Sequence, residues 1–154
     1  MTSSRPWWAE ESISAVDDFL KGRTKPTVFE WGSGGSTNWL LRRCEKLYTV
    51  EHDPKWAAKV PKGATLFRRP LDDSYQDAIK ATSVDGFDLV VVDGRRRVKC
   101  VKEAVRYVRK GGAILLDDSQ RDRYRPAWDM LTYWKPITFR DQQRSTTLFV
   151  QGEL

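Results

Sequence analysis

The segment VFEWGSGGSTNWL, residues 28–40, contains the pattern that decides the fold. An apolar pair leads into Glu30, then glycines and hydroxyl residues follow, and the segment ends in an apolar, helix-like tail. This order is typical of a buried strand that turns through a bare loop into a helix. It raises the question of why an acid stands where the strand should end, directly before a loop that carries almost no side chains.

Strand-like and helix-like segments alternate through most of the chain. The strongest strand signal is FDLVVVD, 87–93, a nearly continuous apolar run of the kind that is buried on both faces of a parallel sheet. The other strand-like segments are 27–30, 47–50, 65–67, 113–118, 137–139 and 146–150. Helix-like spacing occurs in 6–21, 37–44, 75–82, 98–108 and 126–131, and Pro54 opens a further short helix. The alternation predicts a doubly wound α/β fold.

Three details complete the predicted architecture. Ser36 is the expected N-cap of helix 37–44, and Gly111 with Gly112 is expected to end helix 98–108. Only RDQQRS separates the last two strands, which is too short for a crossover helix, so these strands must run antiparallel. The prediction is therefore a Rossmann-like sheet of about seven strands, mostly parallel with an antiparallel C-terminal strand, and helices on both faces.

Composition limits the class of protein. The 154 residues predict one domain, 1–154, with an N-terminal helical segment, 1–22, and a Rossmann-like core, 27–154. The formal net charge of +6 favours anionic partners. Cys44 and Cys100 lie in helix-like segments without a CxxC partner, so a reduced, cytoplasmic location is expected. No apolar run approaches the length of a membrane span, so no membrane partner is expected.

The acid at the end of the first strand distinguishes between two ligand classes. Gly32 and Gly34 fit the dinucleotide fingerprint GxGxxG, but Thr37 occupies its third position. A pyrophosphate beside Glu30 would be repelled, because both groups are negatively charged. An acid at this place makes more sense facing a cation, such as the ammonium group of a ligand.

At this point the sequence resembles the class I S-adenosylmethionine-dependent methyltransferases. Their first motif, an acid followed by x-G-x-G, reads Glu30-Trp31-Gly32-Ser33-Gly34 here. Acids also end the second strand, follow the third and end the fourth, and RKGGAILLDD resembles the turn into that family's fifth strand. The closing antiparallel pair resembles its sixth and seventh strands. The resemblance covers nearly the whole chain and rests on the order and spacing of the motifs together.

The resemblance implies S-adenosylmethionine as cofactor, S-adenosylhomocysteine as product and a specific set of cofactor contacts. Glu30 would meet the ammonium group beside the loop backbone, Glu51 would accept hydrogen bonds from the ribose hydroxyls, and Asp72 or Asp73 would face the adenine. The full implied set is Glu30, Gly32, Ser33, Gly34, Ser36, Thr37, Glu51, His52, Asp72, Asp73 and Asp93. Several of these residues also have a purely structural explanation. Asp-Asp-Ser, residues 72–74, is a common turn sequence, and His52 could be structural.

Methyl transfer from a sulfonium needs a positioned acceptor and, for some acceptors, a base that removes its proton. The candidate catalytic residues are Asp93, Asp117 and His52, with Asp118 beside them. These acids follow the fourth and fifth strands, where the metal-dependent catechol O-methyltransferases also place carboxylates. Mg²⁺ is therefore conceivable but not favoured, because this chain has Asp117-Asp118 where those enzymes typically carry Asp-Asn.

Two basic clusters follow the same strands. GRRRVK comes after the fourth strand and RDRYR after the fifth, and their arginines are expected to converge near the acceptor. Arginine forks suit carboxylate and phosphate groups, so an anionic acceptor is predicted, either a small molecule or an RNA. The predicted acceptor-binding residues are Arg95, Arg97, Asp118 and Arg121. A plain solvated surface is the alternative.

The sequence predicts a methyltransferase that acts as a monomer or a homodimer, with an oxygen acceptor preferred. Three alternatives stay open: a module that binds S-adenosylmethionine without turnover, a nucleic-acid-binding protein, and an NAD-dependent oxidoreductase. Trp7 and Trp8 could form a lid over the site, or they could pack into the core.

Overall fold

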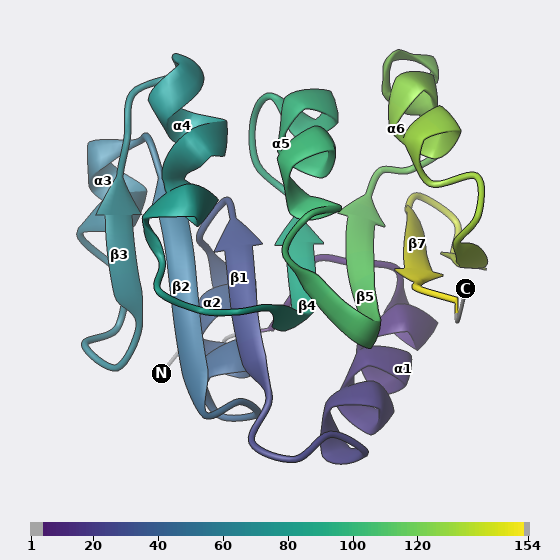
Figure 1. Cartoon of the computed structure of the whole chain (residues 1–154), viewed down its shortest axis with the longest axis horizontal. Coiled ribbons are helices and arrows are strands. Elements are labelled where there is room, and N and C mark those ends of the chain that lie inside the picture. The colour runs from purple at the N-terminus through teal and green to yellow at the C-terminus, as the bar shows by residue number, and fades with distance from the viewer. Residues whose placement is uncertain (1–4, 153–154) are drawn as a thin grey trace.

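The computed structural model describes residues 5–152, which form a seven-stranded sheet flanked by helices (Figure 1). The strand order is β3-β2-β1-β4-β5-β7-β6. Strands β1 to β5 pair in parallel, whereas β7 runs antiparallel to both β5 and β6. The strand bounds are β1 (Thr27–Trp31), β2 (Lys46–Glu51), β3 (Thr65–Arg68), β4 (Phe87–Val92), β5 (Val108–Asp117), β6 (Lys135–Arg140) and β7 (Ser145–Val150). The predicted Rossmann-like sheet with an antiparallel C-terminal strand is confirmed.

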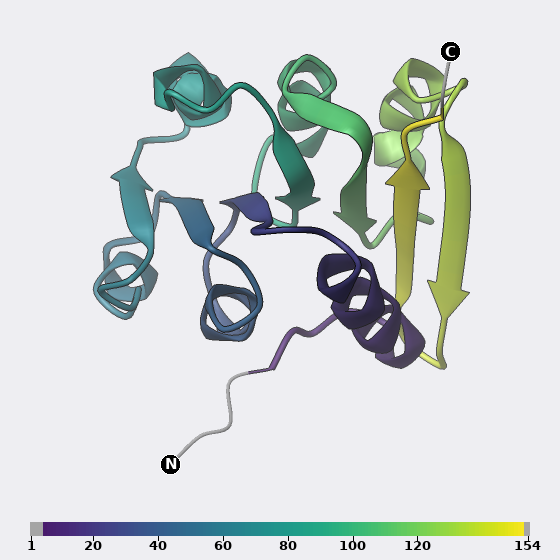
Figure 2. The same ribbon diagram turned by 60° about the horizontal axis from the view of Figure 1, so that its bottom comes forward.

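Helices cover both faces of the sheet, as Figure 2 shows from below. One face carries α1 (Glu10–Lys21), α2 (Gly35–Leu41) and α3 (Pro54–Ala57). The other carries α4 (Asp73–Asp77), α5 (Arg97–Ala104) and α6 (Arg125–Met130), with short 3-10 turns η1 (Ala78–Ala81) and η2 (Asp122–Tyr124). Within residues 5–152, no helix is long and apolar enough to cross a membrane.

The central strand β4 explains why the sheet has two cores. Every residue of β4 is buried, and its apolar side chains alternate between the two faces, as the period of a strand requires. Leu89 and Val91 pack with α1 and α2, whereas Val90 and Val92 pack with the helices of the opposite face. The continuous apolar run in the sequence is therefore the consequence of burial on both sides.

Two boundary predictions were wrong. Ser36 is not an N-cap, because α2 already begins at Gly35 and the Ser36 hydroxyl donates to the buried carboxylate of Glu30 instead. Gly111 and Gly112 do not end a helix, because α5 stops at Ala104 and both glycines lie within β5. The β4–β5 pairing shifts register here, and Gly111 adopts a φ of 77°, which glycine tolerates at little cost.

The parallel strands β1 to β5 end at one edge of the sheet, called here the carboxyl rim. At this rim the loop after β1 lies directly against the loop after β4. Gly32 has a φ of 94°, and a Cβ atom on it would come within 2.6 Å of the Asp93 carbonyl oxygen and 2.7 Å of the Gly94 Cα. Only a residue without a side chain allows this approach, so Gly32 fixes the spacing of the two loops.

We predict that Gly32→Ala lowers the free energy of unfolding by about 2 kcal/mol or more, because the new methyl group meets backbone and the φ is strained. Gly34→Ala is the matched control, since its Cβ would find only the Trp56 ring at 4.0 Å. Urea unfolding of both variants measures the difference. Equal stability of the two variants would show that the contact of Gly32 with the β4 loop does not constrain the fold.

Candidate active site

The acid at the end of β1 is completely buried, with 0% of Glu30 exposed. Its carboxylate accepts hydrogen bonds from the hydroxyls of Ser36, Thr37 (2.7 Å) and Thr49 (2.9 Å). Burial raises the pKa of Glu30 to about 7, although the three hydroxyl donors counteract part of this rise. Glu30 thus holds the first turn of α2 against β2, and its predicted contact with a ligand ammonium group stays a prediction.

The acid at the end of β2 holds the other side of the glycine loop. One oxygen of Glu51 accepts from the backbone N–H of Ser33 at 3.0 Å and from its hydroxyl at 2.5 Å. The other oxygen accepts from the N–H groups of His52 and Asp53, each at 3.0 Å. Four donors fill the acceptor positions of this carboxylate. A ribose hydroxyl would therefore replace one of them, and the predicted ribose contact stays a prediction.

The remaining predicted residues of the adenine side are engaged in local structure. Asp72 caps α4 by accepting from Ser74, and these hydrogen bonds lower the pKa of the Asp72 carboxyl. Asp73 pairs with Arg96 at 2.9 Å. The His52 ring lies 3.3 Å from Glu51 Oε2. None of these side chains lines the cavities at the glycine loop, so their predicted roles toward adenine and in catalysis stay predictions.

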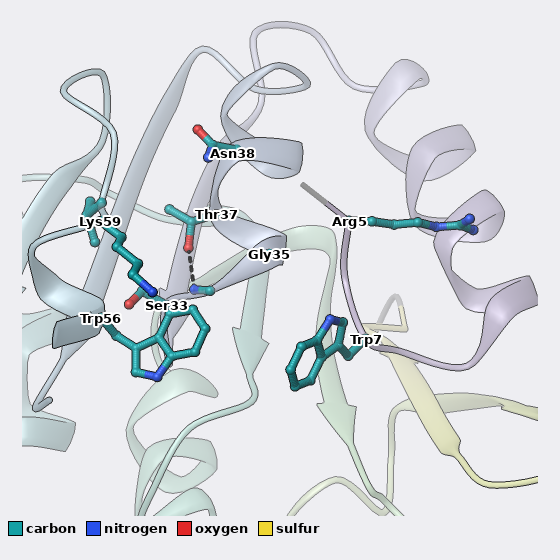
Figure 3. A pocket seen from close by; sticks show the side chains of 10 residues that line it. Arg5, Trp7, Ser33, Gly35, Thr37, Asn38, Trp56 and Lys59 are labelled. Atoms are coloured by element: carbon teal, nitrogen blue, oxygen red, sulfur yellow. Dashed lines mark hydrogen bonds between the residues drawn. The ribbon is translucent and has the colours of Figure 1, made fainter. Parts of the chain in front are cut away.

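Two neighbouring cavities open over the glycine loop. The first, called here the loop pocket, has a volume of about 400 Å³ and extends to the acids after β4 and β5. It is lined by Trp7, Gly32, Ser33, Gly34, Gly35, Ser36, Trp56, Asp93, Arg97, Asp117, Asp118 and Arg144. The second, of about 470 Å³, lies toward α2 and α3 and shares Gly34, Gly35, Trp7 and Trp56 with the loop pocket (Figure 3).

The N-terminal segment uses its two tryptophans in different ways. Trp8 is fully buried, packs edge-on against Trp39 and donates its indole N–H to Asp93 Oδ2 at 3.3 Å. Trp7 is 75% exposed and stands at the mouth of both cavities, where Figure 3 shows it across the loop from Trp56. Trp8 therefore belongs to the core, and Trp7 has the position that a lid residue requires.

The carboxyl groups of Asp93 and Asp117 interact electrostatically at the ends of β4 and β5. Burial and the neighbouring Asp117 carboxyl raise the pKa of Asp93 well above its ordinary value. Burial also raises the pKa of Asp117, although the Thr146 hydroxyl, which donates to it at 2.8 Å, counteracts this rise. A carboxyl group whose pKa is raised by burial and by a neighbouring acid is suited to proton transfer.

Arg97 lies among these acids and joins the two strand ends. Its guanidinium donates to the carbonyl oxygens of Gly94 (2.8 Å) and Asp117 (2.7 Å), and it lies 3.5 Å from the carboxylates of both Asp93 and Asp118. Only 12% of the side chain is exposed. The geometry gives Arg97 these internal contacts, and its predicted binding of the acceptor stays a prediction.

The predicted convergence of the basic clusters is partial. Arg95, Arg96 and Arg97 line one groove together with Arg123, whereas Arg121 and Arg125 line a separate cavity of about 300 Å³. Arg121 lies 3.5 Å from Asp118. Both clusters thus border the acids of the carboxyl rim, but from two sides.

The acids after β4 and β5 do not resemble a metal site. Among residues 5–152, no three histidine, cysteine or carboxylate side chains are grouped in the manner of metal ligands. Arg97 places its own positive charge between Asp93 and Asp118, where a cation would otherwise have to bind. The donor set therefore does not fit Mg²⁺.

Several residues of the site were missed at the level of sequence. Thr49 faces Glu30 across the parallel β1–β2 register, and Thr146 contacts Asp117 from the neighbouring strand β7. Trp56 and Arg144 line the loop pocket from segments to which no motif pointed. Strand order and register, which the motifs do not specify, bring Thr49 and Thr146 to the site, whereas Trp56 reaches it from α3 and Arg144 from the connection between β6 and β7.

We predict that Glu30→Gln removes a pH dependence of stability. The folded protein binds the Glu30 proton more tightly than the unfolded chain, so this stability is complete below pH 4.5 and lost as the pH rises through about 7. The shift corresponds to about 3 kcal/mol at about 1.4 kcal/mol per pKa unit. Urea unfolding across this range should show wild type losing stability relative to Glu30→Gln, while the exposed Glu45→Gln follows wild type. Parallel curves for wild type and Glu30→Gln would contradict the assignment.

Comparison with known proteins identifies the family. Residues 29–119 match the family described as "Methyltransferase domain". No curated protein matches the chain.

Several solved structures share the fold at low sequence identity. A methyltransferase-like protein from Silicibacter pomeroyi is 18% identical, with a TM-score of 0.69 over 98% of this chain and 91% of that one. An rRNA methylase from Streptococcus thermophilus is 9% identical, with a TM-score of 0.73 over 99% of this chain and 100% of that one. MycE methyltransferase of the mycinamycin pathway, solved with Mg, S-adenosylhomocysteine and mycinamycin VI, is 15% identical, with a TM-score of 0.69 over 91% of this chain and 45% of that one. The chain therefore belongs to the methyltransferase-domain family, and its resemblance to the class I S-adenosylmethionine-dependent methyltransferases is confirmed.

Proposed function

We propose that this methyltransferase transfers a methyl group from S-adenosylmethionine to an oxygen atom of an anionic acceptor. The observation that carries the proposal is the partly buried Asp93–Asp117 pair, both members of which line the loop pocket. An oxygen acceptor has to lose a proton when it is methylated. A carboxylate with a raised pKa beside the pocket supplies the base that this reaction requires.

The residues around the loop pocket fit the cofactor. Gly34 leaves open space above the loop, and the pocket volume of about 400 Å³ lies in the range of small-molecule sites. Backbone N–H groups of the loop and the carboxylate of Glu51 would hold the cofactor, and Glu30 would act from beneath by keeping Ser36 and Thr37 in place. S-adenosylmethionine supplies an electrophilic methyl group on its sulfonium sulfur, so the protein need only orient the acceptor and take up its proton.

The proton of the acceptor would pass to Asp93. Both Asp93 and Asp117 line the loop pocket, and Asp117 in addition accepts a hydrogen bond from the Thr146 hydroxyl. A base is most effective when its pKa approaches the working pH, and Asp117 contributes to this by raising the pKa of Asp93. Arg97 and the Trp8 indole fix the position of the Asp93 carboxylate through their contacts with its two oxygens.

The anionic character of the acceptor follows from the charge around the rim. The chain has a net charge of +6, and exposed arginines border the acids on two sides. Arg144 also lines the loop pocket, close to Asp117 and Asp118. A negatively charged acceptor would be drawn toward this rim by the summed positive field.

We predict that Asp93→Asn lowers the rate of methyl transfer about 100-fold or more, because the acceptor proton loses its base. Cofactor binding, followed by the fluorescence of the tryptophans at the pocket, should persist. The exposed Asp18→Asn serves as the control and should transfer methyl groups at the wild-type rate. The measurement is formation of S-adenosylhomocysteine across a panel of anionic and neutral hydroxyl acceptors. Wild-type rates in Asp93→Asn, or preference for neutral acceptors, would contradict the proposal; binding without turnover on any acceptor would favour a non-catalytic module.

A further inference from the structure

A further cavity at the carboxyl rim is lined by positively charged side chains. It has a volume of about 660 Å³ and lies between the start of α5 and η2, on the opposite face of the sheet from α2 and α3. We call it the basic groove. Its lining contains five cationic side chains and no carboxylate, and consists of Gly94, Arg95, Arg96, Arg97, Val98, Lys99, Arg123 and Tyr124.

Only two of these five cations are neutralised by nearby acids. Arg96 pairs with Asp73, and Arg97 pairs with Asp93 and Asp118. The side chains of Arg95, Lys99 and Arg123 form no ion pair or hydrogen bond with any residue in the range 5–152. Three uncompensated positive charges thus face one cavity, and a concave wall concentrates their field.

The aromatic floor of the groove holds its arginines in place. The guanidinium groups of Arg97 and Arg123 pack on the Tyr124 ring, at 5.2 Å and 5.1 Å from its centroid. Tyr124 is itself buried, so it provides a fixed base for both groups. Arg123 therefore loses less freedom when it binds a ligand, and its planar fork matches the geometry of phosphate oxygens.

The basic groove adjoins the reacting centre. Arg97 lines both the groove and the loop pocket, and Gly94 of the groove directly follows Asp93 of the pocket. A ligand anchored in the groove can therefore present another part of itself to Asp93 past the Arg97 side chain. This continuity indicates a binding site for the acceptor rather than an isolated surface patch.

We propose that the basic groove binds two linked phosphate groups of the methyl acceptor. A phosphate monoester carries about 1.5 to 2 negative charges at neutral pH, so one such group would leave the three unpaired cations incompletely balanced, whereas the roughly 3 charges of a diphosphate would balance them. The inference rests on the proposed function and names the acceptor's anionic part. Linked phosphates could belong to a nucleoside diphosphate unit or to successive positions of an RNA strand.

The first test is calorimetric titration of inorganic pyrophosphate and inorganic phosphate without cofactor. We expect pyrophosphate to bind about tenfold more tightly than phosphate, and the Arg95→Gln/Lys99→Gln variant to weaken pyrophosphate binding about tenfold or more. Lys102→Gln/Arg106→Gln is the matched control, because both residues are exposed, lie farther along the chain from the same segment and line no part of the groove. It should bind pyrophosphate within about twofold of wild type. No binding, or an equal loss in both variants, overturns the proposal.

A second titration distinguishes the sources of the phosphates. ADP and a short single-stranded RNA are titrated against the same three proteins. A nucleoside diphosphate unit is indicated if the Arg95→Gln/Lys99→Gln variant binds ADP more weakly and the Lys102→Gln/Arg106→Gln variant binds it as wild type does. RNA is indicated if both double variants bind it more weakly than wild type and the Arg95→Gln/Lys99→Gln variant shows the larger loss. This is the result expected for a strand that continues from the groove along α5. If both double variants lose RNA binding equally and ADP binding is unchanged in both, the RNA is attracted by general charge alone, and the proposal is overturned. Because no cofactor is present, these outcomes do not depend on whether the chain binds S-adenosylmethionine.

Discussion

The guanidinium of Arg97 is the interaction on which the carboxyl rim depends. Through the carbonyl oxygens of Gly94 and Asp117 it ties the end of β4 to the end of β5, and its charge stands between the carboxylates of Asp93 and Asp118. Removing it would leave the Asp93 carboxylate beside Asp117 with only the Trp8 indole N–H as a partner, which is costly in a partly buried site. The same side chain lines both the loop pocket and the basic groove, so the strand ends, the Asp93–Asp117 pair and the proposed acceptor path meet at one residue.

The glycine loop is also held in place by the internal contacts of charged side chains. The two acids of this region are satisfied by hydrogen-bond donors close by: three hydroxyls surround Glu30, and four donors from Ser33, His52 and Asp53 surround Glu51. The two acids clamp the loop from both sides, so its backbone is ordered before any ligand binds. A loop that is already ordered loses less conformational entropy on binding, which is the physical advantage of this arrangement.

The sequence predicted those features that depend on local pattern. The apolar run 87–93 indicated a strand buried on both faces, the short RDQQRS connection required an antiparallel pair, and the motif at Glu30 identified the family. Features that depend on what lies opposite in space were missed. Helix propensity could not show that the Ser36 hydroxyl would serve Glu30, and charge counting could not show that Arg97 is internal while Arg95 is free. The glycines at 111 and 112 mark a register shift with β4, which only the paired strand reveals.

The central claim is that the bare loop after β1 is the cradle of an adenosyl cofactor. Calorimetric titration with S-adenosylhomocysteine and with NAD⁺, on wild type and on Gly34→Leu, tests it most directly. The Gly34 Cβ position points toward Trp56 across open space, so a leucine there would fill the pocket without straining the backbone. The account predicts micromolar binding of S-adenosylhomocysteine to wild type, a loss of about 100-fold or more in Gly34→Leu, and no binding of NAD⁺. Binding of NAD⁺, or equal binding of S-adenosylhomocysteine to both proteins, would contradict it.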